Sequence, residues 1–311
     1  MTTQELFNPL PPVKKNKLPI NPESYPRGRF PSWLHRNLPQ GKAALDTSTI
    51  LAKYRLNTVC EEAKCPNRFE CYSNKTATFL ALGKACTRNC GFCDIDFTKT
   101  PQLPEADEPL RIALSVKELG LKHVVITMVA RDDLPDGGAS SIAAIMRAVR
   151  EENPSTSIEL LTSDFCGNTA SLDFVLQEKP DVFNHNIETV RELTPRVRHK
   201  ATYDQTLRML RHAKASHCAT HIKSGLMVGL GETAAQVEET LRDLCQVGCD
   251  IVTMGQYLQP NQRKLLVKEF ISPEQFKAYE VYGHSLGIKK MYCGPFVRSS
   301  YHAHEVASLD K

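Results

Sequence analysis

The string CTRNCGFC, at Cys86–Cys93, follows an apolar stretch at Thr78–Leu82 that has the length and composition of a buried strand. Its cysteines have the spacing C-x3-C-x2-C and would lie on a short loop directly after that strand. In a parallel barrel, the loops that follow the strands carry the active site. Three thiolates on a four-iron cluster leave one iron without a protein ligand, so the string predicts an iron-sulfur cluster with an open iron.

A zinc knuckle is the alternative interpretation of this loop. Zinc sites usually use four protein ligands in paired C-x2-C units, and only one such unit is present here. The open iron of a cluster can instead bind the amino and carboxylate groups of S-adenosylmethionine and pass it an electron, which releases a 5′-deoxyadenosyl radical. We therefore expect Cys86, Cys90 and Cys93 to be both metal ligands and catalytic residues.

A second cysteine triplet precedes the first, in the string CEEAKCPNRFEC. Cys60, Cys65 and Cys71 have the spacing C-x4-C-x5-C, which fits no common zinc or disulfide pattern. Buried free thiols are an alternative, because cysteine packs like a small apolar residue. The charged residues between these cysteines favour a second, auxiliary cluster, whose fourth ligand would come from elsewhere in the chain.

Cysteine content, net charge and the lengths of apolar runs exclude several classes of protein. The chain has 311 residues and 11 cysteines, an odd number of which six lie between Cys60 and Cys93. This is not a disulfide framework, and with no apolar run of signal-peptide length near Met1 we expect a reducing compartment, the cytoplasm. The net charge of +4, from 39 basic and 35 acidic residues, indicates no nucleic-acid partner. Val124–Ala130, the longest strongly apolar run, is far shorter than the roughly 20 residues of a membrane span.

Six strand-then-helix units predict the fold. The candidate strands are Thr78–Leu82, His123–Val129, Ile158–Leu161, Val182–Asn186, His221–Val228 and Ile251–Met254. Capping residues mark two of the helix starts, with Thr233 and Gln236 before one helix and Ser272 before another. We expect an α/β fold, a partial (β/α)6 barrel of the TIM type, because a complete barrel of eight units needs about 250 residues.

The chain divides into three predicted parts. Residues 1–75 would form an N-terminal arm, with little regular structure up to about Leu56, followed by the auxiliary-cluster segment. Residues 76–290 would form the partial barrel, and the irregular C-terminal segment 291–311 would close the auxiliary cluster.

Six strings together carry a resemblance that covers nearly the whole chain. They are TVCEEAKCPN (Thr58–Asn67), ARDDLPDGGA (Ala130–Ala139), VFNHNIETV (Val182–Val190), KSGLMVGLGE (Lys223–Glu232), GQYLQP (Gly255–Pro260) and GPFVRSSYHA (Gly294–Ala303). In this order they resemble the lipoyl synthase family of the radical S-adenosylmethionine superfamily. Small departures occur at Tyr72, where tryptophan is common, at Lys75, where glycine is common, and at Ser163, where proline is common.

The resemblance implies a role for each cysteine of the two triplets. Cys86, Cys90 and Cys93 would hold the 4Fe-4S cluster that binds S-adenosylmethionine. Cys60, Cys65 and Cys71 would hold an auxiliary 4Fe-4S cluster, completed by a serine of RSSY that we place at Ser300, with Ser299 as the second choice. An oxygen ligand is weaker toward iron than a thiolate, which would suit a cluster that is consumed.

The implied activity is that of a sulfurtransferase. Two S-adenosylmethionine molecules per lipoyl group would abstract hydrogen at C6 and C8 of an octanoyl chain, and each carbon radical would take a sulfur from the auxiliary cluster. The octanoyl chain would already be attached to a lysine of a lipoyl carrier domain, as in 2-oxoacid dehydrogenase E2 subunits or the glycine cleavage H protein. A flavodoxin or ferredoxin would supply electrons, and an iron-sulfur carrier would repair the spent cluster.

Further candidates lie at strand ends. Thr127 could hold the methionine end of the cofactor, and Asn186 and Glu188 could reach its ribose. Arg131, Asp132 and Asp133 follow a strand and could either act in the site or cap a helix. Two other functions stay open: an auxiliary cluster used for electron transfer, or a non-catalytic zinc-binding module.

Overall fold

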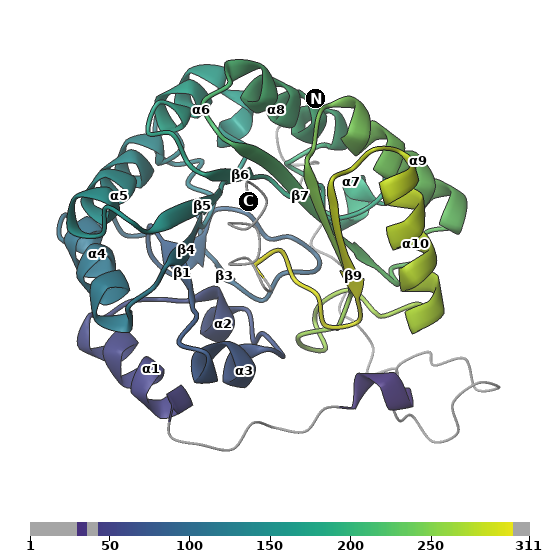
Figure 1. Cartoon of the computed structure of the whole chain (residues 1–311), viewed down its shortest axis with the longest axis horizontal. Helices are drawn as coiled ribbons and strands as arrows, with labels where there is room; N and C mark the ends of the chain where they lie inside the picture. The colour runs from purple at the N-terminus through teal and green to yellow at the C-terminus, as the bar shows by residue number, and fades with distance from the viewer. Residues whose placement is uncertain (1–29, 36–42, 301–311) are drawn as a thin grey trace, which may run out of the picture.

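Seven parallel strands form one curved sheet, and helices cover its outer face, in a computed structural model that describes residues 30–35 and 43–300 (Figure 1). The order of the strands along the sheet is their order along the chain. These strands are β1 (Thr78–Ala81), β4 (His123–Met128), β5 (Ser157–Leu161), β6 (Val182–Asn184), β7 (His221–Val228), β8 (Ile251–Gln256) and β9 (Lys290–Gly294). β1 and β9 are the two edges, so the barrel is partial, as predicted.

Six of these strands were predicted from sequence to within two residues at each end. The seventh, β9, was not, because only one residue of its sequence KMYCG is buried and the strand was included in a segment predicted to be irregular from residue 291. That prediction is wrong for residues 291–294. β9 pairs with β8 over five residues, from Lys290 to Gly294, and adds a strand to the expected six.

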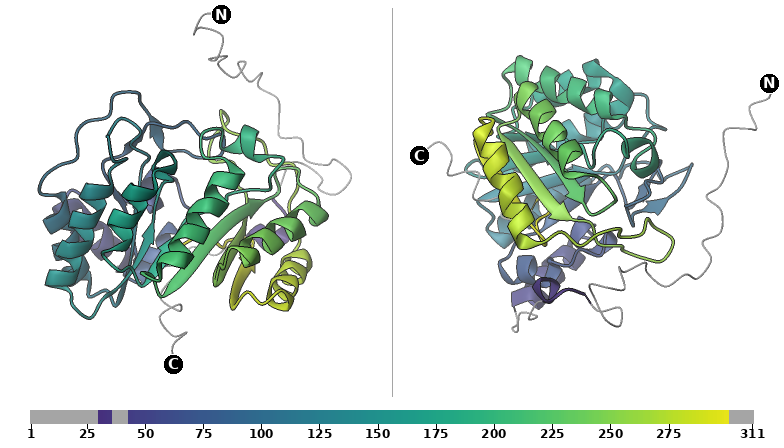
Figure 2. Two further views of the ribbon diagram at one scale, coloured as in Figure 1. Left: turned by 90° about the horizontal axis from the view of Figure 1, so that it is seen from above. Right: turned by 90° about the vertical axis from the view of Figure 1, so that its right-hand side faces the viewer.

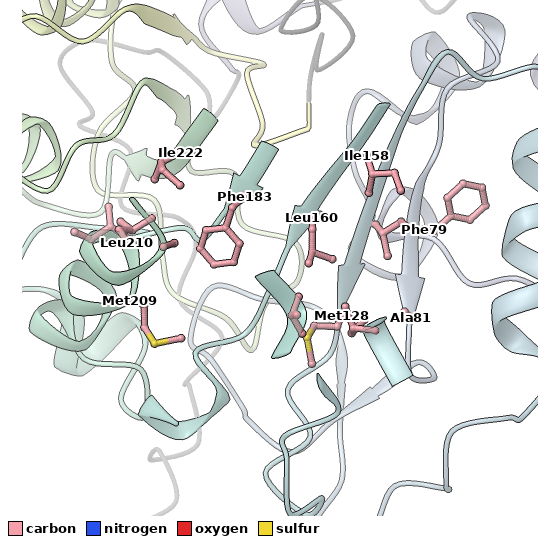
Figure 3. Packing of buried hydrophobic residues seen from close by; sticks show 14 of the residues in the cluster. Phe79, Ala81, Met128, Ile158, Leu160, Phe183, Met209, Leu210 and Ile222 are labelled. Atoms are coloured by element: carbon pink, nitrogen blue, oxygen red, sulfur yellow. The ribbon is translucent and has the colours of Figure 1, made fainter. Parts of the chain in front are cut away.

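Each strand alternates between an outer, helix-facing side and an inner side. The outer positions are apolar and pack against the helices: Figure 3 shows Phe183 and Ile222 of the sheet facing Met209 and Leu210. The inner positions are more polar, and Thr127 is an example. The alternation follows from the pleat of a strand, and it leaves the inside of the barrel for chemistry.

Each connection between neighbouring strands contains one long helix, and the connection from β6 to β7 also contains the short helix α7 (Thr194–Val197). The long helices are α4 (Glu108–Leu119), α5 (Ala139–Glu152), α6 (Thr169–Leu176), α8 (Tyr203–Ser216), α9 (Ala234–Gln246) and α10 (Pro273–Ser285), and α10 lies outside the last strands (Figure 2). The predicted helix starts are confirmed. Thr233 and Gln236 form a reciprocal capping box before α9, and the Ser272 side chain accepts a hydrogen bond from the Gln275 amide before α10. Among the described residues, no helix is long and apolar enough to span a membrane.

Three short helices precede the sheet. They are α1 (Ala43–Lys53), α2 (Val59–Glu62) and α3 (Arg68–Ser73). α1 corrects the prediction of an arm with little regular structure up to Leu56. Leu51 on this helix is 2% exposed, and Thr47 donates a hydrogen bond of 2.8 Å to the Tyr72 carbonyl of α3, so α1 is packed onto the domain.

Two of the departures from the family motifs lie in the same region. The Tyr72 side chain is buried and its hydroxyl lies 2.8 Å from the Thr58 hydroxyl, so it is well accommodated. Lys75 has a φ of +54°, in the left-handed region that glycine adopts without strain. A glycine, which the resemblance leads us to expect at this position, would adopt this conformation without strain.

Candidate functional site

A cavity of about 500 Å³ lies inside the barrel and reaches toward the carboxyl ends of the strands. Both cysteine triplets contribute to its wall, with Cys60 and Cys65 from the triplet nearer the N-terminus and Cys86, Cys90 and Cys93 from the loop after β1. Cys71 is partly buried in α3 and is not among the lining residues. Cysteine loops that are separate in sequence therefore meet at one space, which the spacing of the cysteines alone could not establish.

The loop Cys86–Cys93 is anchored to the ends of two strands through Arg88. The Arg88 guanidinium donates to both Asp132 oxygens at 2.8–3.0 Å and lies 2.6 Å from an Asp164 oxygen. Thr87 adds to this anchor, because its backbone and hydroxyl both donate to the Ala130 carbonyl. Since Asp132 follows β4 and Asp164 follows β5, the loop is held above the strand ends.

This network shifts the ionisation of its carboxylates. Burial alone would raise the pKa of Asp132, but the hydrogen bonds and charge of Arg88 outweigh it, and the pKa falls to about 2. The pKa of Asp164 is lowered too, because Arg88 again outweighs burial. Both carboxylates are therefore ionised at neutral pH. Arg88 supplies one balancing positive charge, and the Lys200 ammonium, 3.1 Å from an Asp132 oxygen, supplies another.

Arg131, Asp132 and Asp133 do not line the cavity. Arg131 is fully buried and forms a bidentate pair with Asp133, at 2.8 and 2.9 Å, while Asp132 binds Arg88 of the loop Cys86–Cys93. The structure thus gives these residues an organising role beside the site rather than a place in its wall.

The loop that carries Cys60 and Cys65 is fixed from both sides. Thr58 caps α2 through a side-chain hydrogen bond from the Glu61 amide. Asn67 is buried, and its amide donates to the Phe296 carbonyl at 2.7 Å. The N-terminal cysteine segment is therefore joined directly to the C-terminal segment after β9.

That C-terminal segment crosses β8 at close range. A Cβ atom at Gly255 would lie 2.0 Å from the Val297 carbonyl oxygen, closer than any real contact, so only glycine permits the crossing. The crossing brings Ser299 and Ser300 to the cavity wall, on the same cavity as Cys60 and Cys65. Ser300 is the last residue that the structure describes at this end.

The thiols of both triplets suit a group larger than one metal ion. All the cysteines named here are free thiols, and those at the cavity approach it from separate loops. Within residues 30–35 and 43–300, no three His, Cys, Asp or Glu side chains converge closely enough to hold a single ion. Burial raises the pKa of Cys60 and Cys90 to about 11 and that of Cys93 to about 12. Because thiolates are the ligands of iron-sulfur clusters, this donor set fits a cluster whose positive irons would displace the thiol protons.

The three residues predicted to contact the cofactor all line the cavity, and two carry further signs of a binding role. The Asn186 side-chain oxygen is buried and accepts no hydrogen bond from the described residues, so it is an open acceptor at the wall. Glu188 has a φ of +67° and is held there by backbone hydrogen bonds to Gly225 and Met227. Burial raises the pKa of its carboxyl. Strained backbone of this kind is concentrated at functional sites.

Sequence reasoning missed Arg198, which lies at the cavity wall. Its guanidinium donates to the Asn186 and Ala201 carbonyls and to the Thr206 hydroxyl. Its positive charge also acts on the Glu188 carboxyl and the Cys90 thiol. The run RVRHK at Arg196–Lys200 was the available signal, but a basic run in a sequence gives no sign that one of its members turns inward.

His185 lies at the same wall and is held by neighbours. Its Nδ1 is 2.9 Å from the Thr162 carbonyl and its Nε2 is 3.3 Å from the Thr206 hydroxyl. Burial, aided by the charge of Arg198, lowers the pKa of His185 to about 4, so the ring is neutral at physiological pH.

Gly229, Gly231 and Ala234 form a G-x-G-x-x-A string after β7, the pattern of dinucleotide-binding loops, but this loop offers no phosphate cradle. The Glu232 carboxylate accepts from the Gly229 and Leu230 amides, which are the groups that a nucleotide phosphate would need. Gly229 is required for packing, since a Cβ there would lie 2.4 Å from the Glu269 carbonyl oxygen.

Comparison with known proteins agrees with this geometry. The radical SAM superfamily pattern matches residues 80–244, which include Cys86, Cys90 and Cys93. The chain is 61% identical over 298 residues to lipoyl synthase of Protochlamydia amoebophila (strain UWE25), with 94% of this chain and 92% of the relative covered. It is 52% identical over 288 residues to lipoyl synthase of Chlamydia trachomatis serovar D, with 93% and 92% covered.

Solved structures share the fold at low identity. Methylornithine synthase (PylB) matches with a TM-score of 0.51 and 15% identity, over 81% of this chain and 82% of that one. Streptococcus suis SuiB matches with a TM-score of 0.55 and 11% identity, over 84% of this chain and 56% of that one. With the radical SAM pattern across the barrel and more than half of its residues shared with curated relatives over nearly its whole length, the chain belongs to the lipoyl synthase family of radical SAM enzymes.

Proposed function

We propose that this chain inserts two sulfur atoms, at C6 and C8, into an octanoyl chain attached to a lysine of a lipoyl carrier domain. The observation that carries the proposal is that cysteines of both triplets line one cavity. One triplet, Cys86, Cys90 and Cys93, suffices to generate a radical, so a second triplet needs another role, which we assign to sulfur donation. The position of Cys60 and Cys65 on the wall of the same cavity supports this role.

The cysteines and serines divide into two ligand sets. We assign Cys86, Cys90 and Cys93 to a 4Fe-4S cluster that binds S-adenosylmethionine, and Cys60, Cys65, Cys71 and Ser300 to an auxiliary 4Fe-4S cluster, with Ser299 as the second choice for its oxygen ligand. When bound, the first cluster and S-adenosylmethionine supply a 5′-deoxyadenosyl radical, and the second supplies sulfide. Every other task falls to the chain itself.

The cavity wall provides polar groups for the cofactor and apolar groups for the substrate. Asn186 offers an open acceptor, Glu188 an ionisable carboxyl and Thr127 a hydroxyl at the end of β4. Leu80, Leu161, Leu226, Met227 and Tyr257 also line the cavity. Unactivated C–H bonds offer no acidic proton to a general base, so a radical is required, and an apolar pocket keeps water from it.

The partners follow from the same chemistry. The substrate is a protein-bound octanoyl group, on carriers such as 2-oxoacid dehydrogenase E2 subunits or the glycine cleavage H protein. A flavodoxin or ferredoxin would deliver the electrons, and an iron-sulfur carrier would rebuild the auxiliary cluster. Free thiols throughout the described chain support a reducing compartment, the cytoplasm.

Two single substitutions test the division of labour. Cys65→Ala should leave reductive cleavage of S-adenosylmethionine intact and abolish sulfur insertion, because it damages only the auxiliary set. Cys90→Ala should abolish both reactions. The measurements are 5′-deoxyadenosine and lipoylated peptide after anaerobic turnover. If Cys65→Ala still inserts sulfur, the auxiliary set is not the donor, and its use for electron transfer becomes the better explanation.

A further inference from the structure

One carboxylate joins the two cysteine loops. Asp94 follows Cys93 directly, and its side chain is only 6% exposed. The Lys64 ammonium, next to Cys65 in the other loop, lies 2.6 Å from one of its oxygens. The Asn261 amide, from the loop after β8, donates to the other. Asp94 therefore holds a residue from each of two separate segments.

The backbone conformation at Lys64 and the hydrogen bonds of the loop that carries Asn261 both support the contacts of Asp94. Lys64 has a φ of +50°, a left-handed conformation that is unfavourable for lysine and turns the chain between Cys60 and Cys65. The loop that carries Asn261 also binds the loop Cys86–Cys93 directly: the Leu265 amide donates to the Gly91 carbonyl at 2.9 Å, and the Lys264 ammonium to the Cys90 carbonyl at 3.3 Å. The loop after β8 therefore holds the loop Cys86–Cys93 in place, and Asp94 joins the segment that carries Cys60 and Cys65 to it.

We propose that Asp94 is a positioning residue that sets the separation between the radical-generating cluster and the sulfur-donating cluster, with Lys64 and Asn261 as its two anchors. This inference rests on the proposed function. A carbon radical must meet its sulfur before it reacts otherwise, and a misplacement of about 1 Å can lower the rate of such a step by about a hundredfold. A loop with its own conformational freedom could not guarantee that distance.

The chain contains a matched comparison for the Lys64–Asp94 pair. Lys53 and Glu118 also form an ion pair of 2.6 Å, and the lysine exposures are similar, at 57% for Lys53 and 63% for Lys64. The difference lies in the carboxylates, since the Glu118 side chain is 35% exposed on an outer helix and the Asp94 side chain is 6% exposed between the two loops. Lys53→Met therefore removes a similar pair without touching the junction.

The experiment uses anaerobically reconstituted full-length protein carrying Lys64→Met, Lys64→Arg, Asp94→Asn or Lys53→Met. Three quantities are measured: iron and sulfide content, the magnetic interaction between the two reduced clusters by electron paramagnetic resonance, and the ratio of 5′-deoxyadenosine formed to sulfur inserted into an octanoyl-lysyl peptide. The magnetic interaction depends on the distance between the clusters and needs no turnover.

Lys64→Met and Asp94→Asn should keep both clusters, change the magnetic interaction and raise the ratio by about threefold or more, since radicals that miss their sulfur are wasted. Lys64→Arg and Lys53→Met should match the unmodified protein. An unchanged interaction and ratio in Lys64→Met and Asp94→Asn overturns the proposal, and so does loss of the auxiliary cluster in Lys64→Met, which would make Lys64 a retention residue. If the unmodified protein inserts no sulfur, the proposed function fails, and the magnetic interaction still decides the role of Asp94.

Discussion

At the scale of single residues, the site depends on ionised side chains that form buried ion pairs. Arg88 is 7% exposed and bonds two carboxylates, Asp132 and Asp164, that follow different strands. Removing one partner from such a group leaves an uncompensated charge. The same arrangement makes the folded state sensitive to the protonation of its carboxylates.

Asp132→Asn should therefore change how stability depends on pH. The pKa of Asp132 falls from 3.8 to about 2 in the folded chain, so its contribution is present above pH 4 and is lost as the pH falls toward 2. At pH 6 we expect the variant to be less stable than the unmodified protein by about 2 kcal/mol, and at pH 3 by roughly half of that. Urea denaturation at both pH values measures the difference. A gap that stays constant between them would contradict the assigned ionisation.

At the scale of elements, the C-terminal segment needs a glycine beneath it. Gly255→Ala would place a methyl group 2.0 Å from the Val297 carbonyl oxygen, which forces the segment away from β8. We expect the barrel to remain folded while the auxiliary cluster is lost and sulfur insertion falls at least about tenfold, because Ser300 no longer reaches the wall. Iron content and lipoylation assays check this.

Gly294 provides the control for that substitution. A Cβ at Gly294 would lie 3.5 Å from a Val297 methyl group, an ordinary contact, and its backbone is not in the left-handed region. Gly294→Ala should therefore retain both the cluster and the activity. Equal behaviour of the two variants would show that the close crossing at Gly255 is not what places the segment.

The elements also show what sequence could and could not predict. Strand patterns located six of the seven strands, and cysteine spacing located both loops, because these signals are local. β9 has a single buried residue and so carries no apolar pattern, and α1 was obscured by its proline-rich surroundings. The hydrogen bond from Asn67 to Phe296 joins residues 229 positions apart, and the pairing of Lys64 with Asp94 depends on how two loops meet. Neither contact produces a local sequence pattern, so neither could be predicted.

At the scale of the whole molecule, a buried ion pair crosses the inside of the barrel. Lys223 of β7 and Glu159 of β5 are both almost fully buried, and their charges lie 2.9 Å apart. Burial would raise the pKa of Glu159, but the charge of Lys223 outweighs it and the pKa is lowered. Asn184 of β6 donates to the same carboxylate, so three neighbouring strands share one polar contact.

Lys223→Met should destabilise the protein by about 3–5 kcal/mol, because it leaves the Glu159 charge buried and unpaired. The double variant Glu159→Gln with Lys223→Met should recover part of this loss. Lys289→Met serves as the control, since Lys289 is 62% exposed and should contribute under about 1 kcal/mol. Denaturant unfolding measures all three, and a cost for Lys223→Met no greater than that of the control would contradict the role given to the pair.

We infer that the radical is formed and the sulfur is donated within one cavity. This inference is tested most directly by anaerobic turnover of an octanoyl-lysyl peptide with S-adenosylmethionine and a reductant. The protein is reconstituted with heavy-isotope sulfide, and the product is analysed by mass spectrometry. We predict a product that carries two sulfur atoms, both of the heavy isotope and both from the protein. A product without added sulfur, or with sulfur of the natural isotope, would contradict the account.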